Sequence, residues 1–262
     1  MPRRTSGLLA VLAMLAGFSA GAAGAAEINV AVAGAMRPVM NELIPAFEKS
    51  SGHKVTVEYA PAGKIDEKVR GDDTVDVAIL PKPRFDKLVG AGKMAGGSAT
   101  PLARVELGLA VKNGAPKPDI GSDEGLKKAL LGAKSIALND PTSGSELGIY
   151  LTKMIDKLGI AGEVKSKLHP VPPSTNPRTS QVILDMVQQG KADIALLAVN
   201  EAIGFAAVEI VPLPADLQSA DLGFVGGTPW TCEQPLAAKD FLDFLTSASA
   251  KAIYKSKAMT PS

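Results

Sequence analysis

The sequence is poor in cysteine, histidine and aromatic residues, and it carries almost no net charge. Its single cysteine, Cys232, excludes an intramolecular disulfide, so packing must stabilise the fold. The two histidines, His53 and His169, have no cysteines or paired carboxylates nearby at ligand spacing, so we predict no metal site and no cofactor. A net charge of +1 does not suggest nucleic acid or an acidic membrane surface as a partner. No Gly-x-Ser-x-Gly elbow indicates a serine hydrolase.

The first residues have the pattern of a secretory signal peptide. Arg3 and Arg4 precede the apolar run Leu8–Phe18, and small residues at 20–25 fit a cleavage site. The apolar run is too short to span a membrane. We therefore predict a cleaved signal peptide at 1–26 and export to the periplasm of a Gram-negative source.

A strand, a tight turn and a helix are predicted directly after this leader. The apolar run Ile28–Ala33 stops at Gly34, and apolar residues then recur at helical spacing, with Pro38 suited to a first helical turn. The unpaired N–H groups of this helix, around Ala35 and Met36, then face the space beyond the strand end. Such a helix start favours an anion.

Apolar strands and amphipathic helices alternate along the rest of the chain, as in α/β proteins with parallel sheets. We expect strands at 54–59, 75–80, 105–112, 135–138, 194–199 and 208–211, and an extended segment at 164–171. We expect helices at 65–70, 83–89, 123–131, 145–158, 179–190, 236–247 and 249–255.

With these units in order, the chain resembles the molybdate-binding, ModA-like branch of periplasmic solute-binding proteins. The resemblance covers nearly the whole mature chain and is carried by residues 28–40, 45–49, 51–52, 75–77, 186–193, 241–245 and 252–254. It implies a two-lobed α/β fold of the periplasmic-binding-protein type (type II-like), with mainly parallel sheets and a ligand cleft between the lobes. On this template lobe one comprises 27–104 plus 214–262, and lobe two comprises 105–213.

The chain departs from that family at the positions expected to hold a metal oxyanion. Molybdate-binding members place serine hydroxyls where this chain has Ala35, Ala62 and Leu80. A tetrahedral oxyanion needs several hydrogen-bond donors, and these side chains supply none. The substitution pattern therefore argues against molybdate.

Cations stand close to these positions, and they favour a ligand with several carboxylates. Arg37, Lys64, Lys82 and Arg84 all follow predicted strand ends in lobe one. Arginine binds carboxylates bidentately, whereas lysine acts as a point charge. Solvated surface side chains are the alternative for each, and for Lys64 in particular. Gly63 before Lys64 belongs to the same turn, which lacks the remaining residues of a phosphate-binding loop.

Lobe two offers polar residues at two predicted helix starts. Ser143 and Ser145 open one helix, and Arg178, Thr179 and Ser180 open another. Helix capping is the structural explanation for the hydroxyls, and it is compatible with ligand binding because the free N–H groups point the same way.

Two functions remain open. One is a transport receptor that closes on a small anion, preferably a polycarboxylate, and presents it to an ABC permease. The other, which we favour, is an isomerase: in a ModA-like enzyme this scaffold moves an allylic proton on a tricarboxylate and interconverts cis- and trans-aconitate. Arg37 and Arg178 are the expected carboxylate clamps, and the base is Lys64, His169 or a carboxylate that the pattern does not locate.

Overall fold

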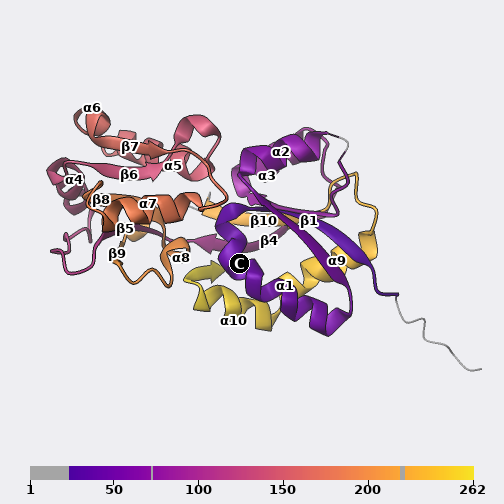
Figure 1. The fold of residues 1–262 in the computed structure, drawn as a ribbon. Helices are drawn as coiled ribbons and strands as arrows, with labels where there is room; N and C mark the ends of the chain where they lie inside the picture. The colour runs from indigo at the N-terminus through magenta and orange to yellow at the C-terminus, as the bar shows by residue number, and fades with distance from the viewer. Residues whose placement is uncertain (1–23, 72, 219–221) are drawn as a thin grey trace, which may run out of the picture.

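Two α/β lobes lie end to end in the computed structural model (Figure 1), which describes residues 24–71, 73–218 and 222–262. Most of the predicted signal peptide lies outside the described residues. Within the described part, no helix is long and apolar enough to cross a membrane.

Lobe one is built on a six-stranded mixed sheet. Its strands are β1 Glu27–Ala33, β2 Lys54–Ala60, β3 Val77–Pro81, β4 Thr100–Val105, β10 Gly223–Gly227 and β11 Met259–Pro261. They are arranged in the order β11-β4-β10-β3-β1-β2. β1 pairs in parallel with β2 and β3, whereas β10 runs antiparallel to both β3 and β4.

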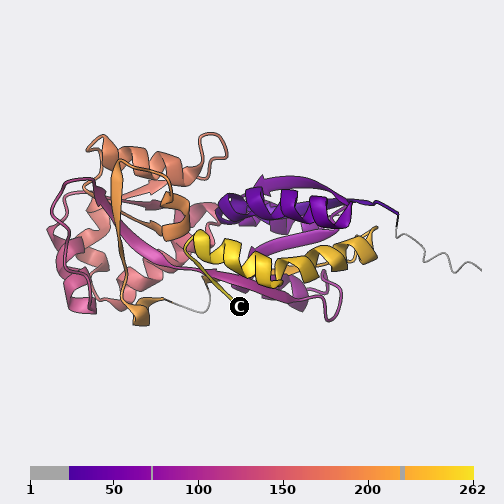
Figure 2. The ribbon, with the colours of Figure 1, turned by 90° about the horizontal axis from the view of Figure 1, so that it is seen from below.

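Helices cover both faces of this sheet (Figures 1 and 2). They are α1 Arg37–Ser51, α2 Ala62–Arg70, α3 Lys82–Gly90, α9 Pro235–Leu245 and α10 Ala248–Ser256. α1, α9 and α10 pack together on one face, and α2 and α3 pack on the other. Phe47 of α1 meets Phe241 of α9 edge to face, with ring centroids 4.9 Å apart. This apolar layer fixes where α1 begins, and so where its N-terminus points.

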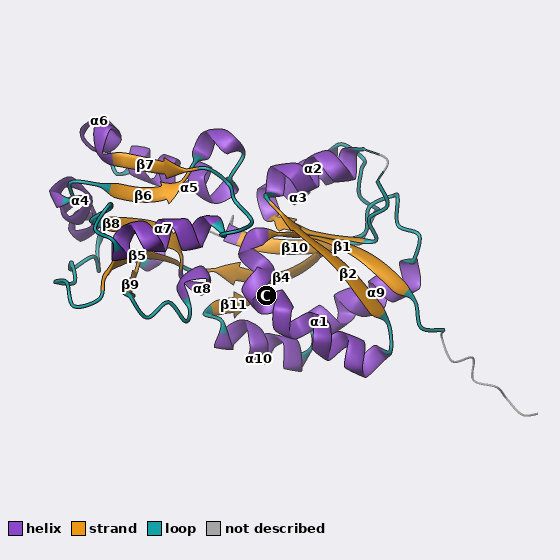
Figure 3. Ribbon diagram, in the orientation of Figure 1, coloured by secondary structure: helices purple, strands orange, loops and turns teal. Residues whose placement is uncertain are grey.

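Lobe two is built on a five-stranded sheet (Figure 3). Its strands are β5 Leu107–Lys112, β6 Ile136–Asn139, β7 Leu168–Val171, β8 Ile194–Ala198 and β9 Val208–Pro212, in the order β7-β6-β8-β5-β9. Its helices are α4 Asp123–Gly132, α5 Glu146–Lys157, α6 Ala161–Val164, α7 Thr179–Gln188 and α8 Val199–Ala202. Short 3-10 turns are η1 Gly34–Met36, η2 Pro141–Ser143, η3 Lys165–Lys167 and η4 Ala215–Leu217.

The chain crosses between the lobes twice, and one side chain ties the crossings together. The first crossing joins β4 to β5 and the second leads from β9 to β10. Gln218, on the second crossing, accepts a hydrogen bond from Leu107 N at 2.8 Å and donates to Leu107 O at 3.0 Å. It also donates to Leu213 O at 3.2 Å. Gln218 therefore braces both crossings at one level.

The α/β architecture agrees with the prediction, but the sheets are mixed rather than mainly parallel. β10 and β5 run antiparallel to their neighbours, because each belongs to a segment that enters one lobe from the other. The strand expected at 105–112 agrees with β5, which starts at Leu107, whereas Val105 ends the strand β4, which was not predicted. The segment expected to be extended over 164–171 is strand only from Leu168.

Two further strands of lobe one, β10 and β11, were not predicted. β10 contains Gly223, Gly226 and Gly227, a composition more typical of a loop. The glycines are needed because a Cβ on Gly226 would lie 2.7 Å from Leu242 Cδ2, and one on Gly227 would lie 2.6 Å from Phe85 Cζ. Close packing against the helices on both faces explains this glycine-rich buried strand.

Candidate functional site

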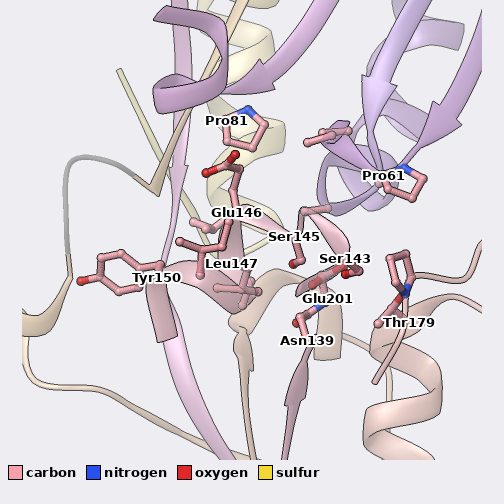
Figure 4. Close-up of a pocket in the computed structure, with 18 of the residues that line it drawn as sticks. Pro61, Pro81, Asn139, Ser143, Ser145, Glu146, Leu147, Tyr150, Thr179 and Glu201 are labelled. Carbon is pink, nitrogen blue, oxygen red and sulfur yellow. The ribbon is translucent and has the colours of Figure 1, made fainter. Parts of the chain in front are cut away.

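A cavity of about 400 Å³ lies between the lobes. Lobe one contributes the ends of β1, β2 and β3 and the turns that follow them. Lobe two contributes the starts of α5 and α7 and the end of β8. Figure 4 shows Pro61 and Pro81 above the cavity and Ser143, Ser145 and Glu201 on the opposite side. Helix starts from both lobes therefore converge on one space, an arrangement suited to an anion.

The lobe-one wall is poor in hydroxyl groups. Ala35 and Ala62 line the cavity, and Leu80 is fully buried in the core. Met36 is also fully buried and does not line the cavity. Gly63 lies just behind the wall, where a Cβ would be 3.9 Å from Gly144 O of lobe two. This side of the cavity offers apolar surface and backbone groups.

Arg37 supplies the cation of the lobe-one wall. Its guanidinium carbon lies 4.4 Å from the centroid of the Tyr59 ring, and both residues line the cavity. Its buried Nε makes no hydrogen bond to the described residues. Burial raises the pKa of Tyr59 to about 12, against the opposing effect of Arg37, so the phenol stays neutral. Stacking on a neutral ring orients the guanidinium at the cavity wall.

The hydroxyls of the lobe-two wall are largely engaged in local structure. Ser145 Oγ caps α5 by accepting from Gly148 N at 3.2 Å, which leaves its own O–H to donate. Ser143 Oγ donates to Asp140 O at 2.6 Å. Thr179 Oγ1 accepts from Ser174 N at 2.8 Å. All three line the cavity, so capping and access to a ligand coexist here.

Arg178 and Glu201 bring opposite charges to the lobe-two wall. Arg178 precedes α7, and Glu201 lies in α8 directly after the buried strand β8. Burial raises the pKa of Glu201 to about 7, although Arg178 and Ser180 both favour its charged form. Ser180 is itself buried, and its Oγ makes no hydrogen bond to a described residue. Glu201 is thus a carboxylate enclosed by protein but open to the cavity.

Two direct contacts join the lobes beside the cavity. Arg84 of α3 forms an ion pair with Glu146 of α5 at 2.6 Å, with both side chains mostly buried. Asn200 of α8 donates to Ala35 O of η1 at 2.8 Å. These contacts hold lobe two against the turns that follow β1 and β3.

Besides Met36, Gly63 and Ser180, which do not line the cavity, three further residues expected near the ligand lie elsewhere. Lys64 pairs with Glu67 at 2.7 Å on the surface of α2, and Lys82 pairs with Asp86 at 2.5 Å on α3. His169 is exposed on β7, at the edge of the lobe-two sheet. None of the three lines the cavity.

Some residues that line the cavity were not predicted from the sequence. Lys87 of α3, Lys153 of α5 and Glu201 all line the cavity. Lys153 lies two helical turns after Glu146, a spacing that places both on one helix face. Glu201 follows a buried strand, as Lys82 does, and this position at a strand end was the available signal. Across residues 24–71, 73–218 and 222–262, no three His, Cys, Asp or Glu side chains are grouped to hold a metal.

Gly148 lets α5 approach the end of β6, and replacing it with alanine is expected to destabilise the protein. An added Cβ would lie 2.5 Å from Asn139 O and 2.9 Å from Pro141 N, so α5 must shift. We expect a loss of about 1–3 kcal/mol, seen as a lower midpoint of thermal unfolding. Gly162→Ala in α6 is the control, because no atom lies within 4 Å of its added Cβ. An equal midpoint for the two variants would contradict the close-packing argument.

Sequence comparison identifies the family. Residues 28–259 match the model for bacterial extracellular solute-binding proteins. The chain belongs to this solute-binding family. It is 26% identical over 240 residues to an aconitate isomerase of Pseudomonas sp, covering 89% of this chain and 87% of that protein. It is 30% identical over 159 residues to the molybdate-binding protein ModA of Azotobacter vinelandii, covering 60% of this chain and 61% of that protein.

Solved structures of the solute-binding family share the fold. The substrate-binding domain of a putative molybdenum ABC transporter from Clostridium difficile superposes with a TM-score of 0.72 at 18% identity, covering 90% of this chain and 99% of that one. The two-lobed α/β fold and the ModA-like relationship expected from the sequence are therefore confirmed.

Proposed function

We propose that this solute-binding protein is a periplasmic isomerase that interconverts cis- and trans-aconitate by moving an allylic proton. One observation carries the proposal: Arg37 from lobe one and Arg178 from lobe two line a single cavity between the lobes, and the carboxylate Glu201 lines it too. Arginines on opposite walls suit a substrate with carboxylates at both ends. They also stabilise the negative charge that develops when a proton leaves carbon.

The walls of the cavity support a carboxylate ligand over a metal oxyanion. Ala35 and Ala62 add no hydroxyl donors, whereas Lys87 and Lys153 add cations. A flat, partly apolar substrate with several carboxylates suits such a mixture of apolar wall and separate cations better than a compact tetrahedral anion does.

Glu201 favours an enzyme over a transport receptor. A carboxylate facing the cavity opposes the binding of an anion, so it is a cost to a receptor. Proton abstraction, in contrast, requires a base within reach of the substrate. The interlobe contacts of Arg84 and Asn200 would exclude water while the intermediate is charged.

The alternative is a receptor that delivers a small anion to an ABC permease. The family match and the 30% identity to a molybdate-binding protein favour it. Under this alternative Arg37 and Arg178 bind the same class of anion, and Glu201 tunes selectivity.

Proton NMR in deuterated water separates the two functions. Purified protein lacking the leader is mixed with trans-aconitate, and we expect the cis isomer to appear until equilibrium is reached. If neither the cis isomer nor deuterium uptake is observed, the isomerase proposal is refuted. Thermal stabilisation by citrate or tricarballylate without turnover would support the receptor, and stronger stabilisation by molybdate or tungstate would overturn the carboxylate argument.

A further inference from the structure

We infer that Glu201 is the single base that removes the allylic proton and returns it to the second carbon, an assignment that rests on the proposed isomerase function. Glu201 lines the cavity from α8, and it makes no ion pair within 4.0 Å among the described residues. Glu146 also lines the cavity, but its carboxylate is engaged by Arg84 at 2.6 Å. Glu201 is therefore the lining carboxylate that is available to a substrate.

The surroundings of Glu201 make it a base of suitable strength. Burial destabilises the charged carboxylate, while Arg178 and the Ser180 hydroxyl stabilise it. The balance leaves its pKa at about 7, close to the pH at which proton transfer in both directions is efficient. Arg37 is the cation on the facing wall and would bind substrate, since it lines the cavity with its guanidinium held on the Tyr59 ring.

The proposed step conserves atoms and electrons without an oxidant or cofactor. The ionised Glu201 carboxylate takes a proton from the methylene carbon, which breaks one C–H bond and forms an O–H bond. The electron pair spreads over the three-carbon allylic unit and the attached carboxylates, where Arg37 and Arg178 stabilise it. Glu201 then donates the proton to the other end of the unit, which forms a new C–H bond and moves the double bond by one position.

The neighbouring residue Asn200 links this base to closure of the lobes. Asn200 and Glu201 share the short helix α8, and Asn200 donates across the cleft to Ala35 O at 2.8 Å. The contact holds α8 against η1 when the lobes are closed, so it places Glu201 over the cavity at the time when substrate is enclosed. Asn200 is a positioning residue in this scheme.

The test compares wild type with Glu201→Gln, which keeps the shape of the side chain but cannot accept the proton. We expect kcat for trans-aconitate to fall at least 1,000-fold, in line with the loss of a general base within an assembled site. Binding of tricarballylate, measured by calorimetry, should be retained or tightened because a negative charge is removed. Glu163→Gln is the matched control, since Glu163 is exposed on α6 and does not line the cavity.

The possible outcomes separate this assignment from the proposed function. An active wild type with a Glu201→Gln variant that keeps more than a tenth of kcat would overturn the role of Glu201 and leave the isomerase standing. A wild type with no turnover would overturn both. Retained tricarballylate binding shows that the variant is folded, and Glu201→Asp, with a carboxylate one methylene shorter, should recover part of the lost activity. An Asp variant no more active than Glu201→Gln would contradict the role of Glu201 as the base.

Discussion

Replacing Arg178 with methionine is expected to lower kcat/KM for aconitate by roughly 100- to 1,000-fold, equivalent to about 3–4 kcal/mol. Arg178 faces the cavity, and a charged hydrogen bond to a substrate carboxylate is lost with it. The same arginine lowers the pKa of Glu201, so its removal leaves burial unopposed by that charge. The acid limb of the kcat/KM profile should therefore move from about pH 7 to higher pH, which initial rates across the pH range will measure.

Lys128→Met provides the matched control for that experiment. Lys128 is an exposed cation of lobe two on α4, and it does not line the cavity. Its loss should leave both kcat/KM and the position of the acid limb unchanged. A drop in activity for Arg178→Met without any movement of the acid limb would separate Arg178 from the titration of Glu201.

Glu201→Gln is expected to stabilise the protein in neutral and alkaline solution. The pKa of Glu201 rises from 4.5 to about 7 on folding, so the folded state holds this proton more tightly than the unfolded state. Stability falls as the pH rises from about 4.5 to 7, and the full cost applies above that range. Glutamine does not ionise and avoids the cost, which is at most about 3 kcal/mol.

Thermal unfolding at two pH values tests this expectation. At pH 8 the midpoint of Glu201→Gln should exceed that of wild type by roughly 5–10 °C, and at pH 4.5 the two should nearly coincide. Glu163→Gln, on the surface of α6, should differ little from wild type at either pH. A stabilisation that is equal at both pH values would mean that ionisation of Glu201 is not its cause.

The first strand, turn and helix were predictable because local sequence determines them. The apolar run 28–33, the turn at Gly34 and the helical spacing after Pro38 agree with β1, η1 and α1. The side of the cavity formed by Ala35 and Arg37 follows from that unit. The first crossing between the lobes was not predictable in detail, because β4 and β5 follow each other with only Glu106 between them, and no turn signal marks where one sheet ends and the other begins.

Glu201 illustrates what the sequence did not reveal about the site. A glutamate after a buried strand is ordinarily a solvated residue, and no local pattern distinguishes this one. Its unusual pKa arises from residues distant in sequence, because the rest of the protein encloses it while Arg178 and Ser180 of the α7 region approach it. The role expected for Lys64 or His169 remains a prediction, but neither residue lines the cavity, which makes Glu201 the stronger candidate.

The position of Gln218 has a consequence for how hydrogen isotopes would be distributed in the product. Gln218 bonds to both crossings at the level of Leu107, so any opening of one lobe from the other would pivot there. Such a swing would part Asn200 from Ala35 and Arg84 from Glu146 together, so solvent would reach Glu201 when the substrate is free to leave. Under the proposed isomerase function, the closed lobes would limit exchange of the abstracted hydrogen with bulk water. Most product molecules should then carry the hydrogen that the substrate brought in, with isotope from the medium entering at only a small fraction of turnovers.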